Sequence, residues 1–254
     1  MKKILRFLLG AVLLLFAYLY FGPYHFLLLA ANKAFETGRD TAFLEDYAYF
    51  DNREVKAAAI AQPWPKHGQY NKIPLSEKIS EEHEKFQSVA FLVIQQDSLL
   101  HESYYNGYGE DSTSNLFFMA KSYVSALLGK AIEEGKIESL DQKVGDFLPA
   151  YQTGLAADLT VGDLSSMASG LDWNEKYDLS INGMMEAYIT PNLDKLMNSR
   201  KVTSTPGEGF VYLSGNTQLL GMVLTKALDQ SLSSYFEEKF WQPMGAEETA
   251  LWQL

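Results

Sequence analysis

The stretch that decides the fold is Asn115-Leu-Phe-Phe-Met-Ala-Lys-Ser-Tyr-Val-Ser-Ala-Leu-Leu-Gly129, which continues as Lys130-Ala-Ile-Glu-Glu-Gly135. Its apolar residues recur at the three- and four-residue spacing of a buried helix face: Met119, Val124, Leu127, Leu128, Ala131 and Ile132. Side chains three residues apart share a helix face, so Phe118 and Lys121 are expected side by side. A serine at such a position, near the positive end of the helix dipole, would be placed to form an oxyanion. Phe118 has no hydroxyl to attack a carbonyl, and no serine in the sequence is followed by a lysine three residues later.

Further segments on either side of this helix have recognisable patterns. Residues 91–108 alternate as a β-hairpin does, with Gln96-Asp97 at the turn. Leu159–Trp173 predicts a short helix with Thr160 as N-cap, Asp163 three residues later and Gly170 at the C-terminal end.

Two patterns follow toward the C-terminus. Pro206–Gly221 places Tyr212 and Ser214 at the entrance of a helix that packs through Leu219, Leu220 and Val223. Ser234–Gly245 predicts another capped helix, which Pro243 and Gly245 would end.

In this order, the segments resemble those of the serine β-lactamase and penicillin-binding-protein superfamily. Their residue patterns are most similar to the esterase and 6-aminohexanoate-dimer-hydrolase branch. The resemblance runs from about residue 89 to residue 254. It implies an α/β protein, with a β-lactamase/transpeptidase-like fold that has a central antiparallel sheet and a largely helical subdomain. In that family the nucleophile stands in a Ser-x-x-Lys pattern, where this chain has Phe118 and Lys121, and a Tyr-x-Asn or Tyr-x-Ser pattern follows.

The resemblance also implies the roles of the site residues. A serine at position 118 would be acylated, Lys121 would activate it, Tyr212 would relay the proton, and Ser214 would take part in substrate binding. A phenol titrates near ~10, and we expect the neighbouring ammonium of Lys121 to hold Tyr212 ready for proton transfer. The implied substrate is an ester, an amide or a D-amino-acid peptide, cleaved through an acyl-enzyme. With Phe118 at the nucleophile position, we expect the chain to be inactive.

The alternative hypothesis is a non-catalytic pseudoenzyme that binds cell-envelope peptides or a protein partner, with Phe118 filling the mouth of the site. Family members also continue into further strands and a Lys-Thr-Gly-like motif, which this sequence does not contain. We therefore expect the sheet to be incomplete, with a bare edge and an apolar face, and the polypeptide alone to fold poorly.

Composition limits the other possibilities. The apolar content of 47% with 21% charged residues indicates a globular protein. A net charge of −11 argues against a nucleic-acid partner. Without cysteine there is no thiol chemistry, and the four histidines lack metal-ligand spacing, so we expect no metal and no cofactor. No pattern in the sequence indicates an oligomeric state.

The N-terminal residues have the composition of a leader. Lys2, Lys3 and Arg6 flank an apolar run that reaches Gly22, close to the ~20 residues that a spanning helix needs. We expect residues 1–31 to be a retained signal anchor rather than a cleaved signal peptide. Residues 32–85 would be an irregular connecting segment, and residues 86–254 the N-terminal part of the hydrolase domain. The domain would lie outside the cytoplasm, held at the cytoplasmic membrane or, after cleavage, secreted or periplasmic.

Overall fold

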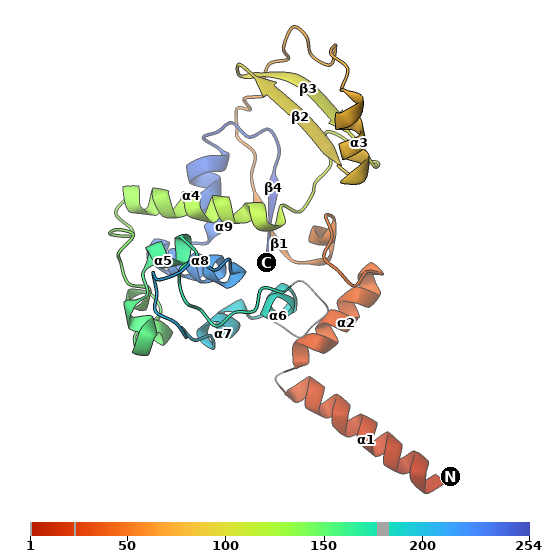
Figure 1. The fold of residues 1–254 in the computed structure, drawn as a ribbon, viewed down its shortest axis with the longest axis vertical. Coiled ribbons are helices and arrows are strands. Elements are labelled where there is room, and N and C mark those ends of the chain that lie inside the picture. The colour runs from red at the N-terminus through yellow and green to blue at the C-terminus, as the bar shows by residue number, and fades with distance from the viewer. Residues whose placement is uncertain (1, 23, 177–182) are drawn as a thin grey trace. The chain divides into compact units, whose positions relative to one another are not determined.

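The computed structural model describes residues 2–22, 24–176 and 183–254. The chain divides into two compact units (Figure 1). The first contains residues 1–49 and 116–236, and the second contains residues 50–115 and 237–254.

The first unit is helical. Its N-terminal part holds α1 (Lys2–Phe21) and α2 (His25–Thr37). Its larger part holds α4 (Ala120–Glu133), α5 (Val161–Ser165), α6 (Gly183–Ile189), α7 (Leu193–Asn198), α8 (Ser214–Leu228) and α9 (Leu232–Phe236).

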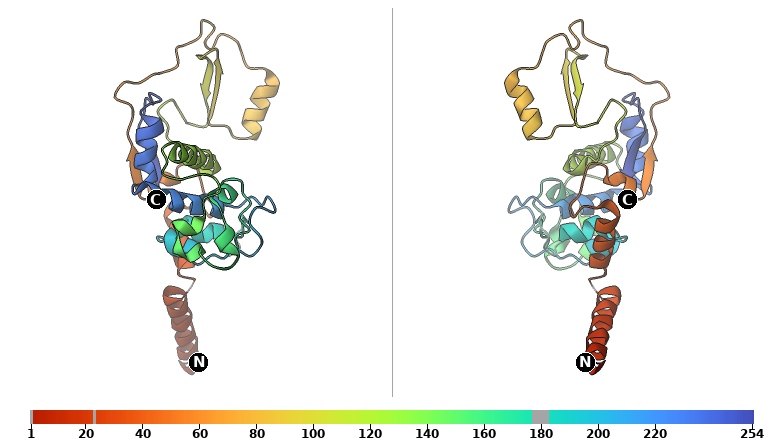
Figure 2. Two further views of the ribbon diagram at one scale, coloured as in Figure 1. Left: turned by 90° about the vertical axis from the view of Figure 1, so that its left-hand side faces the viewer. Right: turned by 90° about the vertical axis from the view of Figure 1, so that its right-hand side faces the viewer.

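The core of this unit forms around α8, which packs against α4, α5 and α9 (Figures 1 and 2). The expected apolar stripe of α4 is buried at Val124, Leu127, Leu128 and Ala131. Met119, which was expected on this buried face, is 62% exposed, because it lies in the 3-10 turn before the helix. On α8, Leu219, Leu220, Val223 and Leu224 are buried at the same helical spacing. These two faces fix the relative position of the first turns of α4 and α8, where the predicted site residues lie.

The second unit holds two separate antiparallel strand pairs and a helix. β2 (Ala90–Gln95) pairs with β3 (Ser98–Tyr104), and β1 (Asn52–Val55) pairs with β4 (Ala250–Gln253). The expected hairpin turn is confirmed, because Gln96 and Asp97 both adopt positive φ, as a tight two-residue turn requires. α3 (Glu77–Lys85) precedes the hairpin and is capped by the side chain of Ser76.

Three segments differ in detail from the sequence expectation. Residues 32–85, expected to be irregular, contain the end of α2, β1 and α3. α5 has the predicted capping box of Thr160 and Asp163, but it ends at Ser165, and Gly170 lies beyond it in the loop. The helix expected over residues 234–245 begins earlier, as α9, and continues as a π-helical turn over Glu237–Trp241.

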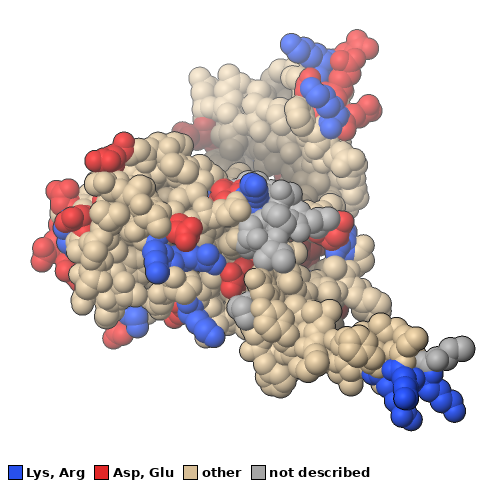
Figure 3. Space-filling view, turned by 60° about the horizontal axis from the view of Figure 1, so that its bottom comes forward, with Lys and Arg blue, Asp and Glu red and all other residues tan. Residues whose placement is uncertain are grey.

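α1 is long enough and apolar enough to cross a membrane, although a signal sequence has the same properties. None of its residues is buried. Figure 3 shows basic side chains gathered at its free end, beside a surface without charge along the helix.

Candidate active site

Phe118 and Lys121 lie where a short 3-10 turn, Phe117–Met119, leads into α4. Phe117 has a φ of 45°, a left-handed conformation that a bulky side chain rarely adopts. Such strain tends to persist at functional positions, where the surrounding structure enforces it. The strained turn thus immediately precedes the position that a nucleophile would occupy.

Lys121 is the centre of the candidate site. Its Nζ donates a hydrogen bond to Oγ of Ser214 at 2.7 Å. The same atom lies 4.9 Å from the ring centre of Phe118 and 5.4 Å from that of Tyr212. The rings of Phe118 and Tyr212 meet edge to face, with centroids 6.5 Å apart. The structure therefore brings all four predicted site residues together from the entrances of α4 and α8.

Glu175 is a fifth member of this cluster. Its Oε1 accepts the hydroxyl of Ser214 at 2.5 Å, and its Oε2 accepts the backbone N–H of Ser214 at 2.7 Å. The indole N–H of Trp173 also donates to Oε2, at 2.8 Å. Glu175 was not among the site residues predicted from the sequence. The local feature that could have indicated it is its position two residues after Trp173, at the end of the Leu159–Trp173 motif.

Two loops that are distant in sequence carry Glu175 and Tyr212, and backbone hydrogen bonds hold them together. Leu171 forms an antiparallel bridge with Val202, and Asp172 N–H donates to the carbonyl of Lys201 at 2.7 Å. Further along, Val211 N–H donates to the carbonyl of Met167 at 2.8 Å. These hydrogen bonds hold both loops next to the N-terminal end of α8.

Two glycines permit close approaches in this region. Gly170 has a φ of +66°, and a Cβ there would lie 2.2 Å from the carbonyl oxygen of Ser204. Gly215, in the first turn of α8, lets the ring of Trp173 lie against the helix, since a Cβ would come within 2.7 Å of ring atoms. Next to it, the buried pair Ser169 and Asn216 share a short hydrogen bond. The site is therefore built on a closely packed frame.

The electrostatics of the site favour Lys121 as a base. Burial lowers the pKa of the Lys121 amine below its ordinary value, and the negative charge of Glu175 opposes that shift. Burial, with a smaller contribution from Glu175, raises the pKa of the Tyr212 phenol. The raised pKa favours the protonated form of the Tyr212 phenol, and the expectation that Lys121 holds Tyr212 ready for proton transfer stays a prediction.

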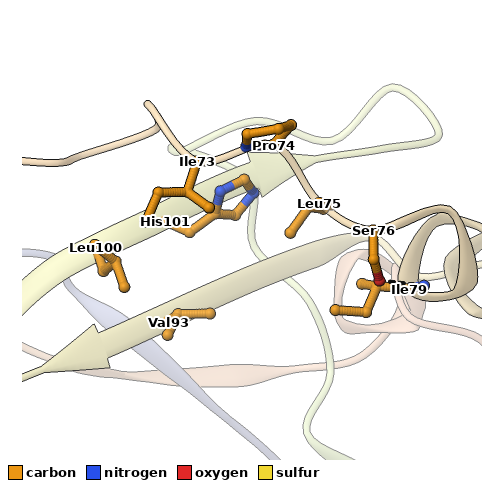
Figure 4. Close-up of a pocket in the computed structure, with 8 residues that line it drawn as sticks. All are labelled: Ile73, Pro74, Leu75, Ser76, Ile79, Val93, Leu100 and His101. Carbon is orange, nitrogen blue, oxygen red and sulfur yellow. Dashed lines mark hydrogen bonds between the residues drawn. The ribbon is translucent and has the colours of Figure 1, made fainter.

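A pocket of about 190 Å³ lies in the second unit, between the hairpin and the start of α3 (Figure 4). It is lined mainly by apolar side chains, including Ile73, Val93 and Leu100. None of the predicted site residues lines it. In the described part of the chain, no group of three or more His, Asp or Glu side chains is placed to hold a metal ion.

The helical unit around a Lys-Ser-Tyr cluster and the antiparallel strand pairs define an α/β protein with the β-lactamase/transpeptidase-like fold, as the sequence predicted. The model of the family described as Beta-lactamase matches residues 75–254. The chain belongs to this family.

Individual proteins are similar to this chain in sequence or in fold. The chain is 25% identical over 175 residues to a 6-aminohexanoate-dimer hydrolase of Paenarthrobacter ureafaciens, a match that covers 63% of this chain and 43% of the relative. Its fold is similar to that of a putative 6-aminohexanoate-dimer hydrolase from Bacillus anthracis, with a TM-score of 0.70 and 18% identity over 83% of this chain and 60% of the other. It is also similar to a putative beta-lactamase from Bacteroides dorei, with a TM-score of 0.53 and 22% identity over 67% of this chain and 50% of the other. The chain thus spans less than half the length of the curated relative.

Proposed function

We propose that this chain has the acyl-transfer site of a β-lactamase-family serine hydrolase for ester, amide or D-amino-acid peptide bonds, and that Phe118 leaves it without turnover. The observation that carries this proposal is the position of Phe118, whose ring lies 4.9 Å from the Lys121 ammonium in the turn that opens α4. The name of the relative from Paenarthrobacter ureafaciens refers to hydrolysis of a dimer, which is consistent with an amide or ester substrate.

The remaining residues divide the chemistry in a consistent way. A serine at position 118 would give up its proton to the Lys121 amine, whose lowered pKa makes it a better base near neutral pH. Tyr212, with its raised pKa, would keep its proton for the leaving group. Loss of the nucleophile alone costs on the order of a million-fold in turnover in a comparable acyl-transfer site.

The test is Phe118→Ser in the full chain, solubilised in detergent. We expect hydrolysis of nitrophenyl esters and covalent labelling by a fluorophosphonate probe, with neither in the unchanged chain. Phe118→Ala is the matched control, because it removes the ring without supplying a hydroxyl. If Phe118→Ser neither hydrolyses the esters nor reacts with the probe, the acyl-transfer proposal is wrong.

A second candidate is a binding protein for cell-envelope peptides. It is favoured by the contact of the Phe118 ring with both Lys121 and Tyr212, which gives the unchanged site an aromatic and a cationic surface. Titration of the unchanged chain with a peptidoglycan stem peptide, followed by calorimetry, tests it. Saturable binding that Lys121→Met removes would support this function, and no binding across a set of such peptides would contradict it.

We further propose that α1 anchors the protein in the cytoplasmic membrane with the remaining chain outside the cytoplasm. Its length of 20 residues matches the apolar core of a bilayer. The basic residues that precede and begin the apolar run favour a cytoplasmic N-terminus.

A further inference from the structure

We infer that Glu175 is a positioning residue of the acyl-transfer site, which fixes the direction of the Ser214 hydroxyl and, through it, the place and charge of Lys121. This inference rests on the proposed function above. It concerns a residue that no motif in the sequence singled out.

The first step is the geometry of the carboxylate. Glu175 uses both oxygens on one residue: Oε1 accepts the hydroxyl of Ser214 at 2.5 Å, and Oε2 accepts its backbone N–H at 2.7 Å. These two hydrogen bonds fix the position of Ser214, the first residue of α8, and limit its side chain to a single orientation. Hydrogen bonds to a charged acceptor are roughly twice as strong as neutral ones.

The second step follows from the direction of these hydrogen bonds. A hydroxyl has one proton, and Ser214 gives it to Glu175, so the lone pairs of Oγ face the other way. There they accept a proton of the Lys121 ammonium at 2.7 Å. Lys121 is half-buried, and its flexible side chain would otherwise have several rotamers to choose from. The carboxylate therefore orients the lysine without touching it.

The third step is the support of Glu175 itself. Trp173 is 8% exposed and donates its indole N–H to Oε2 at 2.8 Å. Its ring lies against Gly215 in the same first turn of α8, and the guanidinium of Arg200 lies 5.6 Å from the ring centre. The carboxylate is thus fixed to a packed aromatic ring.

The contacts of the backbone also argue against Ser214 as a replacement for the missing nucleophile. Its backbone N–H, which could have stabilised an oxyanion, is occupied by the Glu175 carboxylate. A negative charge beside the attacking oxygen would also oppose the charge that develops in acyl transfer. Ser214 is therefore a link between Glu175 and Lys121.

The test compares Glu175→Gln with Glu133→Gln in the full chain in detergent. Both variants remove one negative charge, but Glu133 lies twelve residues from Lys121 on α4, about 18 Å along the helix. The measurement is the pH dependence of Lys121 acetylation by acetic anhydride, followed by mass spectrometry with Lys226 as internal reference. Only the neutral amine reacts, so the midpoint reports the protonation of Lys121.

We expect Glu175→Gln to move this midpoint to lower pH by about one unit, since an opposite charge that favoured the ammonium has gone. Glu175→Asp keeps the charge on a shorter side chain and should stay nearer the unchanged chain. It also provides the comparison if Glu175→Gln does not fold. A Glu175→Gln midpoint equal to that of Glu133→Gln would overturn the inference.

The same substitution in the Phe118→Ser background gives an independent readout. The rising limb of the pH–rate profile should shift to lower pH, together with a fall in kcat from the misplaced lysine. An unchanged profile with a folded protein would overturn the inference. If Phe118→Ser is inactive in every form, the proposed function fails, and the acetylation midpoint of the unchanged background still decides the role of Glu175.

Discussion

Phe118 lacks a nucleophilic hydroxyl, but its ring makes favourable contacts of its own. An ammonium within about 6 Å of an aromatic centre gains ~0.5–1 kcal/mol at an exposed position, and Lys121 meets this condition with both Phe118 and Tyr212. Phe118 is also 45% exposed, so it can leave this position at little cost in core packing. A serine at the same position is therefore compatible with the structure.

The contacts of Ser214 predict how its replacement changes the free energy of unfolding. Ser214→Ala removes an oxygen that both accepts from Lys121 and donates to Glu175, which leaves two charged groups without their shared partner. We expect a loss of about 1–3 kcal/mol in the free energy of unfolding, measured by urea denaturation followed by tryptophan fluorescence. Ser166→Ala is the control, because that exposed hydroxyl donates to the carbonyl of Gly162, in the helix α5 that Ser166 directly follows. Equal effects of the two substitutions would show that Ser214 links nothing.

Sequence spacing predicted only part of this cluster. Phe118 and Lys121 are three residues apart, and Tyr212 and Ser214 are two apart, so a local pattern reveals each pair. Glu175 bonds a residue 39 positions away, and nothing in its own neighbours marks that partner. A carboxylate in a loop is ordinarily solvated, and only the folded position of Trp173 makes this one different.

Among the structural elements, the two loops that meet before α8 depend most on one backbone position. Gly170→Ala would place a Cβ 2.2 Å from the carbonyl oxygen of Ser204, in a left-handed conformation. Gly135, which follows α4, has a nearly identical φ of +67° but open space around it. The left-handed conformation alone costs roughly 1–2 kcal/mol, and overpacking adds about 1–3 kcal/mol.

We therefore expect Gly170→Ala to destabilise the protein clearly more than Gly135→Ala, with the difference in unfolding free energy reporting the contact with Ser204. Thermal unfolding of both variants by circular dichroism measures it. Gly170→Ala should also weaken the hold on Tyr212, since the loop that carries it pairs with residues 167–172. A Gly170→Ala variant as stable as Gly135→Ala would mean that the loop 202–204 moves aside freely.

The elements differ in how far local sequence defined them. The hairpin turn at Gln96-Asp97 and the capping box at Thr160 were predictable, because both rest on residues within four positions of each other. The β1–β4 pair was not, since its strands come from distant parts of the chain and only four residues of each take part. For the same reason, the sequence did not predict that the two strand pairs form separate sheets.

For the orientation of the whole molecule in a membrane, the distribution of charged residues along the chain matters more than the net charge. The net charge of −11 belongs to a chain whose first helix, α1, has three basic residues in its first five positions and no acidic ones. Each of these charges at the centre of a bilayer would cost roughly 2.5–3.5 kcal/mol. This cost opposes translocation of the N-terminus, which agrees with the proposed orientation.

The absence of cysteine allows a direct test of this orientation, because any introduced thiol is unique. Lys3→Cys places it at the basic end of α1, and Ser166→Cys places it at the exposed position that directly follows α5. In intact spheroplasts, a membrane-impermeant maleimide should label Ser166→Cys and should label Lys3→Cys only after permeabilisation. Lys3→Cys labelled from outside would reverse the proposed orientation. Loss of the residue-3 thiol from the mature protein, seen by mass spectrometry, would instead identify α1 as a cleaved signal peptide, because a retained anchor must keep its N-terminus.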